Sequence, residues 1–163
     1  MKSLFTQVVC LECNHEMPAD MTLSACEKCG SPWLDARYNY DAVPGAWDKD
    51  LLYRERSLWR YGELLPMADP EDDITMGEGY TPLIRLLQYE RLYNHEHLYV
   101  KDERHQPTNS FKDRQAALAV TAMKRQGITE CVLASTGNAA VAYAAYCARA
   151  GIKLWLFLTS LAP

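Results

Sequence analysis

The sequence lacks three features that would assign it directly to a class of protein. It has no apolar run long enough to cross a membrane, because Asn138, Arg149 and Lys153 interrupt its most hydrophobic part, residues 131–158. It has no excess of positive charge, since 17 Lys and Arg stand against 21 Asp and Glu, and it has no internal repeat. With 163 residues, 48% of them hydrophobic, we expect a globular protein that binds neither membranes nor nucleic acid.

A secretory signal is also missing from the first residues. The stretch MKSLFTQVVCLEC contains few apolar residues before it meets Glu12. We therefore expect the protein in the cytoplasm, where thiols stay reduced and disulfides are rare.

Four of the six cysteines form two CxxC pairs, in the segments CLEC and CEKC. A CxxC turn brings two thiolates to one side of a metal, so two such turns predict a tetrahedral zinc site made by Cys10, Cys13, Cys26 and Cys29. Zinc would stabilise a ribbon, residues 1–36, that is too short to build a core of its own. Iron on the same four sulfurs, or a redox or disulfide role, remains an alternative at this point.

The charge of the predicted ribbon argues against a nucleic-acid partner. Residues 1–36 carry two lysines and five acidic side chains, a formal charge of -3, whereas ribbons that bind nucleic acid need the opposite sign. The two remaining cysteines, Cys131 and Cys147, lie in apolar patterns, and we interpret them as buried small hydrophobic residues.

Residues 37–75 show no catalytic pattern. We interpret them as a linker with a short amphipathic helix that Pro66 ends, followed by an acidic loop and a turn at Gly77 and Gly79. Its aromatic residues have the character of packing anchors: Trp47, Tyr53, Trp59 and Tyr61.

The last third of the chain alternates between strand and helix patterns. Strands are predicted over residues 97–103, 130–135 and 152–160, and helices over 109–127 and 136–151. The first helix should be capped by Asn109 or Ser110 and stopped by Gly127, and the second should end at Gly151. This order predicts an α/β protein with an open parallel βαβαβ sheet, whose last strand is apolar enough to be buried.

Lys112 lies where the first of these helices begins, at the end of a strand-to-helix loop. In parallel sheets, ligands bind at such loops. The positive end of the helix disfavours a protonated amine, so Lys112 is a candidate for a Schiff base with an aldehyde. The alternative is a solvated lysine paired with Asp113 or Glu103. The second loop, residues 134–138, offers backbone N–H groups that can receive a carboxylate.

These segments together resemble a known family. The run SFKDR, preceded by KDE and followed by ASTGNAAVAYAAYCARAGI, closely resembles the N-terminal part of threonine synthases. These are pyridoxal-phosphate enzymes of the tryptophan-synthase-β-like fold, also called fold type II. The four-cysteine ribbon, SLWRYGELLP and GEGYTPL are similar to segments of the ribbon-bearing threonine synthases in the same order, so the likeness covers nearly the whole chain.

The resemblance implies roles for individual residues. Lys112 matches the lysine that holds pyridoxal phosphate and moves protons at the substrate carbons. Phe111 beside it is expected to wall the cofactor pocket. Asn138 matches the asparagine that bonds the ring hydroxyl of the cofactor. The loop expected to grip the substrate carboxylate consists of Ser135, Thr136, Gly137 and Asn138.

The implied reaction converts O-phosphohomoserine to threonine and phosphate, with a small amino-acid substrate and a homodimer as the complete enzyme. Two residues depart from the family pattern: Asn109 stands where many relatives carry glycine, and Ala139 stands where many carry a hydroxyl residue. Both differences weaken the assignment of the substrate more than the assignment of the cofactor. Two alternatives remain. One is a sister pyridoxal-phosphate enzyme, such as a threonine ammonia-lyase or a cysteine or cysteate synthase. The other is a non-catalytic zinc-ribbon binding module.

The predicted organisation is therefore a zinc ribbon over residues 1–36, a linker over 37–75, and an incomplete pyridoxal-phosphate domain over 76–163. The loop that holds the cofactor phosphate and the group facing the pyridine nitrogen come later in this fold than residue 163. We therefore expect an N-terminal portion that is inactive by itself.

Overall fold

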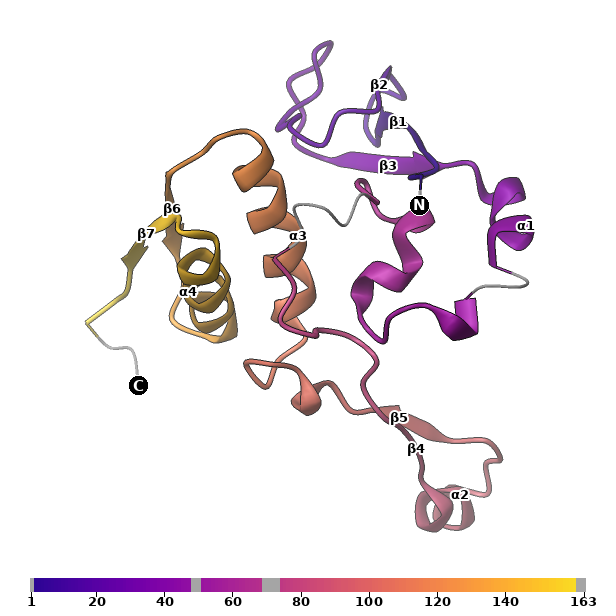
Figure 1. The fold of residues 1–163 in the computed structure, drawn as a ribbon. Coiled ribbons are helices and arrows are strands. Elements are labelled where there is room, and N and C mark those ends of the chain that lie inside the picture. The colour runs from indigo at the N-terminus through magenta and orange to yellow at the C-terminus, as the bar shows by residue number, and fades with distance from the viewer. Residues whose placement is uncertain (1, 48–50, 69–73, 161–163) are drawn as a thin grey trace. The chain divides into compact units, whose positions relative to one another are not determined.

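The structure is a computed structural model that describes residues 2–47, 51–68 and 74–160. The chain divides into two compact units (Figure 1). The first comprises Met1–Glu55 and Trp59–Glu71, and the second comprises Arg56–Leu58 and Asp72–Pro163. The domain boundaries expected at residues 36 and 75 stay a prediction. Part of the expected acidic loop, residues 69–73, lies outside the described residues.

The first unit contains a small antiparallel sheet. Its strands are β1 (Phe5–Cys10), β2 (Glu16–Pro18) and β3 (Leu34–Tyr38), in the order β2-β1-β3. Alternate residues of β1 point inward, as expected for a strand with one buried face. The small core under this sheet consists of Val8, Cys10, Met17 and Cys26. Two cysteines in so small a core fit a ribbon that a metal completes.

The expected linker helix is a series of short turns. These are η1 (Tyr40–Ala42), α1 (Val43–Trp47), η2 (Leu51–Tyr53) and η3 (Leu58–Leu64). The packing roles predicted for Trp47 and Trp59 are confirmed, because Trp59 is buried and the Trp47 ring lies 5.5 Å from that of Tyr61. The prediction for Tyr53 is wrong. It is 89% exposed, because η2 is a single turn with no buried residue.

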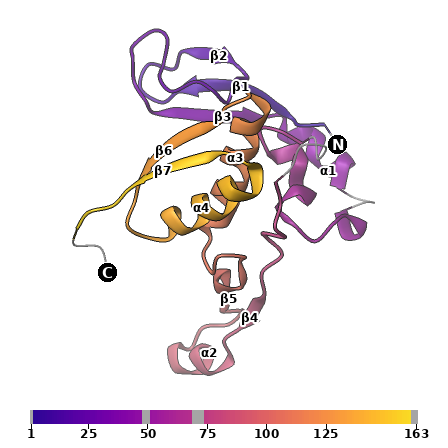
Figure 2. The same ribbon diagram turned by 60° about the vertical axis from the view of Figure 1, so that its left-hand side comes forward.

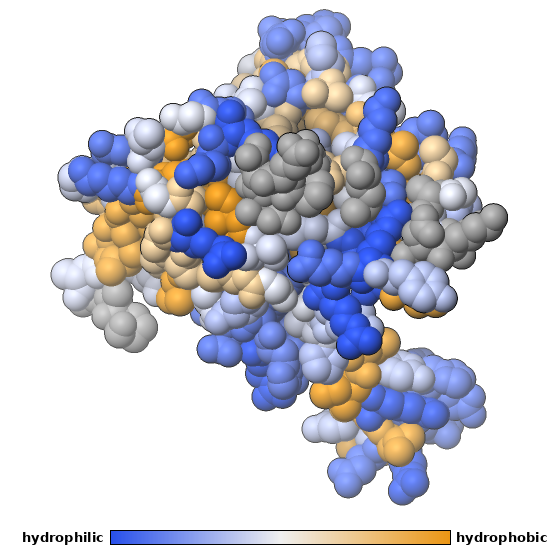
Figure 3. Space-filling view, in the orientation of Figure 1, coloured by the Kyte–Doolittle hydropathy of each residue, from blue (hydrophilic) through white to orange (hydrophobic). Residues whose placement is uncertain are grey.

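The second unit begins with a short hairpin whose strands flank a helix. Strand β4 (Leu83–Arg85) pairs antiparallel with β5 (Tyr99–Lys101), and α2 (Leu87–Tyr93) lies between them in the chain. Several apolar side chains of this segment are exposed: Leu83, Ile84, Leu87 and Leu92. The lobe at the lower right of Figure 3 shows orange patches among blue ones.

This pairing corrects the predicted topology. The strand expected over residues 97–103 is only three residues long and belongs to the hairpin, not to the parallel sheet. The parallel part is a single βαβ unit of β6 (Glu130–Ala134), α4 (Asn138–Ala150) and β7 (Lys153–Phe157). The βαβαβ sheet is therefore wrong for its first strand. The nearer partner β4 satisfies the backbone groups of β5 without a crossover.

The two long helices are where the sequence predicts them. Helix α3 (Lys112–Arg125) packs against α4, and α4 packs against β7 (Figure 2). The predicted ends at Gly127 and Gly151 are confirmed, because both glycines have φ near +70°. At the start of α3 the Ser110 hydroxyl accepts from the Lys112 backbone N–H, although Phe111 is the residue at the cap position.

The predicted burial of the last strand is only half correct. Leu154 and Leu156 are partly covered, whereas Trp155 and Phe157 on the opposite face of β7 are exposed. Cys147 is buried as predicted, and Cys131 is half-buried with its Sγ 3.8 Å from that of Cys147. Within the described residues, no helix has both the length and the hydropathy that crossing a membrane requires.

Candidate active site and metal centre

The four cysteines of the CxxC pairs come together at one end of the small sheet. Their Sγ atoms all lie within 4.8 Å of one another, and the pairs Cys10–Cys29 and Cys13–Cys26 are each 3.6 Å apart. Four sulfurs around one zinc ion at about 2.3 Å are about 3.8 Å apart, so the cluster has the spacing that zinc requires. All four are free thiols, so no disulfide occupies the position.

The local backbone favours a thiolate at one of these positions. Cys10 is completely buried at the end of β1. The backbone N–H of Cys13 lowers the pKa of the Cys10 thiol to about 6, against the opposing effect of burial. A thiolate is the form of cysteine that binds a metal. The donor set and the spacing therefore fit a four-sulfur metal centre.

Lys112 is the first residue of α3, as the sequence predicts. Its Nζ lies 3.3 Å from Gln115 Oε1 and 4.9 Å from the centre of the Phe111 ring. The two acidic residues considered as ion-pair partners of Lys112 bind other residues instead. Asp113 accepts from the Thr108 backbone N–H at 2.8 Å and from its hydroxyl at 2.6 Å, and Glu103 binds Arg114 at 2.9 Å. The amine therefore lies beside an aromatic ring with one neutral hydrogen-bond partner.

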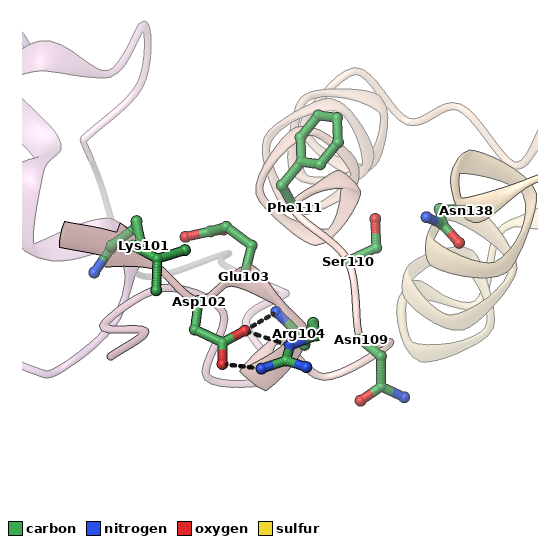
Figure 4. A pocket seen from close by; sticks show the side chains of 9 residues that line it. Lys101, Asp102, Glu103, Arg104, Asn109, Ser110, Phe111 and Asn138 are labelled. Carbon is green, nitrogen blue, oxygen red and sulfur yellow. Dashed lines mark hydrogen bonds and ion pairs between the residues drawn. The ribbon is translucent and has the colours of Figure 1, made fainter. Parts of the chain in front are cut away.

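A cavity of about 350 Å³ brings together residues from both helix starts. Figure 4 shows Asn109, Ser110 and Phe111 on the segment that leads into α3, and Asn138 on the neighbouring helix. Two of the predicted cofactor residues, Phe111 and Asn138, thus line one cavity. Lys112 is not part of this lining, and it borders the cavity through the Phe111 ring.

The predicted substrate loop lines a second cavity, of about 450 Å³. Thr136, Gly137 and Asn138 form its polar end, so Asn138 is shared with the first cavity. The remainder is apolar: Ala140, Val141, Ala144, Leu156 and Leu158. Ser135 is not in this lining, and its hydroxyl accepts from the Gly137 backbone N–H at 3.4 Å. Polar backbone at the start of α4 therefore faces a mainly apolar hollow.

Asn109 has a backbone conformation that explains one departure from the family pattern. Its φ is +61°, in the left-handed region where glycine is favoured and where asparagine is the best tolerated replacement. The difference from glycine at this position therefore leaves the loop conformation intact and adds an amide to the cavity wall.

Charged residues between β5 and α3 form the opposite wall, and the sequence assigned them no role other than the possible pairing of Glu103 with Lys112. Hydrogen bonds from Arg104 at 2.7 and 2.8 Å hold the pKa of Asp102 at about 2. Glu103 accepts two bonds from Arg114 at 2.9 Å, and these, more than its bonds to other residues, lower the pKa of Glu103 to about 2. The motifs KDE and SFKDR contain these residues, but sequence spacing alone does not show that they pair.

Comparison with known proteins supports the expected relationship. Residues 74–163 match the family described as pyridoxal-phosphate dependent enzyme. The chain is 37% identical over 150 residues to threonine synthase of Methanocaldococcus jannaschii, and the match covers 91% of this chain and 36% of that one. It is 36% identical over 149 residues to threonine synthase of Methanosarcina acetivorans, with the same shares covered. The chain thus spans about a third of the length of these relatives.

Proposed function

Because the chain belongs to the family of pyridoxal-phosphate dependent enzymes, we propose that it is the lysine-bearing, N-terminal portion of a lyase that makes threonine from O-phosphohomoserine. The observation that carries this proposal is the convergence of two helix starts at one cavity. The segment entering α3 contributes Phe111 next to Lys112, and α4 contributes Asn138. An amine, an aromatic wall and an amide donor are the groups that a pyridine aldehyde needs.

Each of these residues has a chemical task in the proposed site. Pyridoxal phosphate, when bound, supplies an electron sink for charge that develops on the amino-acid substrate. Lys112 would hold it covalently and would carry a proton on Nζ between the substrate carbons. The Asn138 amide would donate to the ring hydroxyl oxygen. Phe111, which is exposed here, would exclude water from one side of the ring.

The substrate carboxylate would bind at the start of α4. Backbone N–H groups there point out of the helix, and the helix dipole favours a negative charge at this end. Ser135 and Thr136 add hydroxyl groups in the same loop. A small amino acid is therefore the proposed substrate class, and we also propose that the complete enzyme is a homodimer. The cytoplasmic location stays a prediction.

We propose zinc for the four-cysteine centre. The Sγ spacing and the free thiols support a single tetrahedral ion. Such an ion would stabilise the ribbon and take no part in the reaction, because four protein ligands leave no open coordination position for a substrate.

The proposed reaction can be tested with a longer protein. In this protein, the 163 residues replace the matching part of Methanocaldococcus jannaschii threonine synthase. We expect phosphate release and threonine formation from O-phosphohomoserine by the chimera, and neither product from the 163 residues alone or from a chimera with Lys112→Ala. A fully active Lys112→Ala chimera would overturn the proposal. Deamination of threonine in place of phosphate release would favour the sister ammonia-lyase.

A further inference from the structure

Helices α3 and α4 meet through surfaces that consist mainly of small side chains. Six of the eleven residues that the two helices bury are alanines, and the larger ones are Asp113, Val120 and Thr121 on α3 and Tyr146 and Cys147 on α4. Large side chains interlock as ridges and grooves and thereby fix how far one helix lies along another. The alanine part of these surfaces is shallow, so it contributes little to fixing this axial register, and polar contacts carry a larger share. The register matters because the candidate active site is formed from the starts of both helices.

A loop from outside the helix pair is bonded to α4 in its interior. We call residues 76–81 the clamp loop. Its Glu78 is completely buried, and Oε2 accepts from the Tyr146 hydroxyl of α4 at 2.8 Å and from the Met76 backbone N–H at 2.9 Å. Burial, and then the nearby Glu78 carboxylate, raise the pKa of Tyr146 far above its ordinary value. The phenol therefore keeps its proton and remains a donor to Glu78.

The same loop is bonded to α3 through a second carboxylate. The Thr81 hydroxyl donates to Glu103 Oε1 at 2.7 Å, and Arg114 of α3 donates to both oxygens of Glu103 at 2.9 Å. Gln106 forms a second link between Glu103 and the clamp loop. Its amide donates to Glu103 Oε2 at 2.7 Å and its oxygen accepts from the Gly79 backbone N–H at 2.9 Å.

We propose that the clamp loop fixes the axial register of α3 against α4, with Glu78 and Glu103 as positioning residues that set Lys112 relative to Asn138. The effect on catalysis rests on the proposed function. The claim that the clamp loop fixes the register does not depend on it. One residue of sliding moves a helix by about 1.5 Å, which is enough to break a hydrogen bond. Because the bonds to Glu78 are buried, losing them leaves buried polar groups poorly satisfied, which disfavours a shifted register.

Buried polar contacts can fix register in this way because they are satisfied in one arrangement only. Apolar contacts between alanines change little when a helix shifts by a turn. A hydrogen bond depends on distance and angle, so such a shift breaks the bonds from Tyr146 to Glu78 and from Arg114 to Glu103. One bond joins the helices directly, from Lys124 Nζ of α3 to the Ala150 carbonyl of α4 at 2.6 Å, at the ends of both helices. The clamp loop adds directional contacts nearer the helix starts, where the candidate active site lies.

The test uses alanine-methyl NMR of the protein. Tyr146→Phe removes the bond to α4, and Thr81→Val removes one bond to Glu103, with little change of shape in either case. Tyr143→Phe is the matched control, because Tyr143 is half-buried on the same helix and its hydroxyl bonds to no other residue in the part of the chain that the structure describes. We expect Tyr146→Phe to weaken the existing NOEs between alanine methyls of α3 and α4 and to create new methyl pairs. Thr81→Val should produce weaker versions of both effects, and Tyr143→Phe should leave the existing NOEs unchanged and create no new methyl pairs.

A role in stability alone predicts a different result. In that case Tyr146→Phe lowers the melting temperature but leaves the NOE pattern unchanged in the folded protein, and this outcome overturns the proposal. Labelling of Lys112 by pyridoxal phosphate and borohydride is measured in parallel on the unsubstituted protein. Absence of that label contradicts the proposed function but does not change the NOE result. The proposed function and the register proposal can therefore be refuted independently.

Discussion

The hydroxyl oxygen of Tyr146 lies 2.8 Å from Glu78 Oε2, and both side chains are completely buried. The two residues are 68 positions apart in the chain. Their bond joins the glycine turn before β4 to the middle of α4, the helix that begins with Asn138. A buried carboxylate with a neutral phenol donor is costly to disturb, so this contact restrains the relative placement of its two segments.

Lys112 should be the principal site of labelling by pyridoxal phosphate and borohydride. Two of the competing amines are tied to backbone carbonyls, since Lys101 Nζ donates to Thr81 O and Lys124 Nζ donates to Ala150 O at 2.6 Å. A third, Lys153, pairs with the Glu130 carboxylate. Among the described residues, the one hydrogen-bond partner of Lys112 Nζ is the Gln115 amide oxygen at 3.3 Å. Peptide mapping by mass spectrometry identifies the modified residue. Label found mainly on Lys101 or Lys124 would contradict the assignment.

Cys26→Ser should remove most of the bound zinc. The four-sulfur cluster leaves no fifth cysteine nearby to replace a lost ligand in the described residues, and structural zinc sites depend on all four. Elemental analysis should give about one zinc per chain for the unsubstituted protein. Cys131→Ser is the control, and it should retain full zinc because Cys131 lies on β6 and is not one of the four clustered cysteines. Iron as the bound metal would correct the proposed identity of the ion.

Gly79→Ala should destabilise the protein by about 2–4 kcal/mol. Gly79 has φ +103°, and an added Cβ would lie 2.6 Å from the Leu58 backbone nitrogen, where the backbone has to move. Gly77→Ala is the matched control. Its φ is +87° with nothing within 4 Å of an added Cβ, so we expect only the backbone strain, about 1–2 kcal/mol. Urea unfolding measures the free energy of unfolding of both variants. Equal losses of stability in the two would show that the added Cβ at Gly79 does not clash with Leu58.

The stabilising effect of Glu103 should disappear in acid. Its pKa is lowered from 4.5 to about 2 in the folded protein, so the folded state favours the charged form. That contribution is fully present above the unfolded pKa and is lost as the pH falls from about 4.5 through about 2. Glu103→Gln should therefore be less stable than the unsubstituted protein at pH 6, by about 1–3 kcal/mol.

The pH dependence of this difference separates charge from shape. Between pH 5 and pH 2 the free energies of unfolding of the two proteins should converge, because protonated Glu103 resembles glutamine. Urea unfolding at several pH values gives the difference directly. A difference that stays constant over this range would show that the ion pair with Arg114 is not what Glu103 contributes.

Several features of this protein were predicted correctly because local sequence decides them. The CxxC spacing places two thiols on one turn whatever surrounds it, and the four sulfurs do converge. Glycine tolerates a left-handed backbone, so Gly127 and Gly151 end their helices as expected. The position of Lys112 at the start of α3 follows likewise from a helix pattern that begins after Ser110.

Other features depend on partners that the sequence does not reveal. A three-residue strand such as β5 can pair with any nearby edge, and only the folded chain shows that β4 is that partner. Tyr53 has the composition of a packing residue, but it is exposed because no segment of its unit covers it. The sequence therefore determined the two long helices and the glycines that end them, whereas the sheet topology was decided by which strand edges met.

The candidate site divides in the same way. The sequence alone determined that four cysteines could share one metal, because the CxxC spacing places two thiols on each turn, and its resemblance to a family singled out Lys112 and Asn138 as the residues proposed to act on the cofactor. Only the tertiary structure decided that Glu78 is buried against Tyr146 and that Glu103 joins Thr81 to Arg114. Burial and hydrogen bonding of a carboxylate depend on segments distant in the chain, so no local pattern distinguishes these two acids from exposed ones.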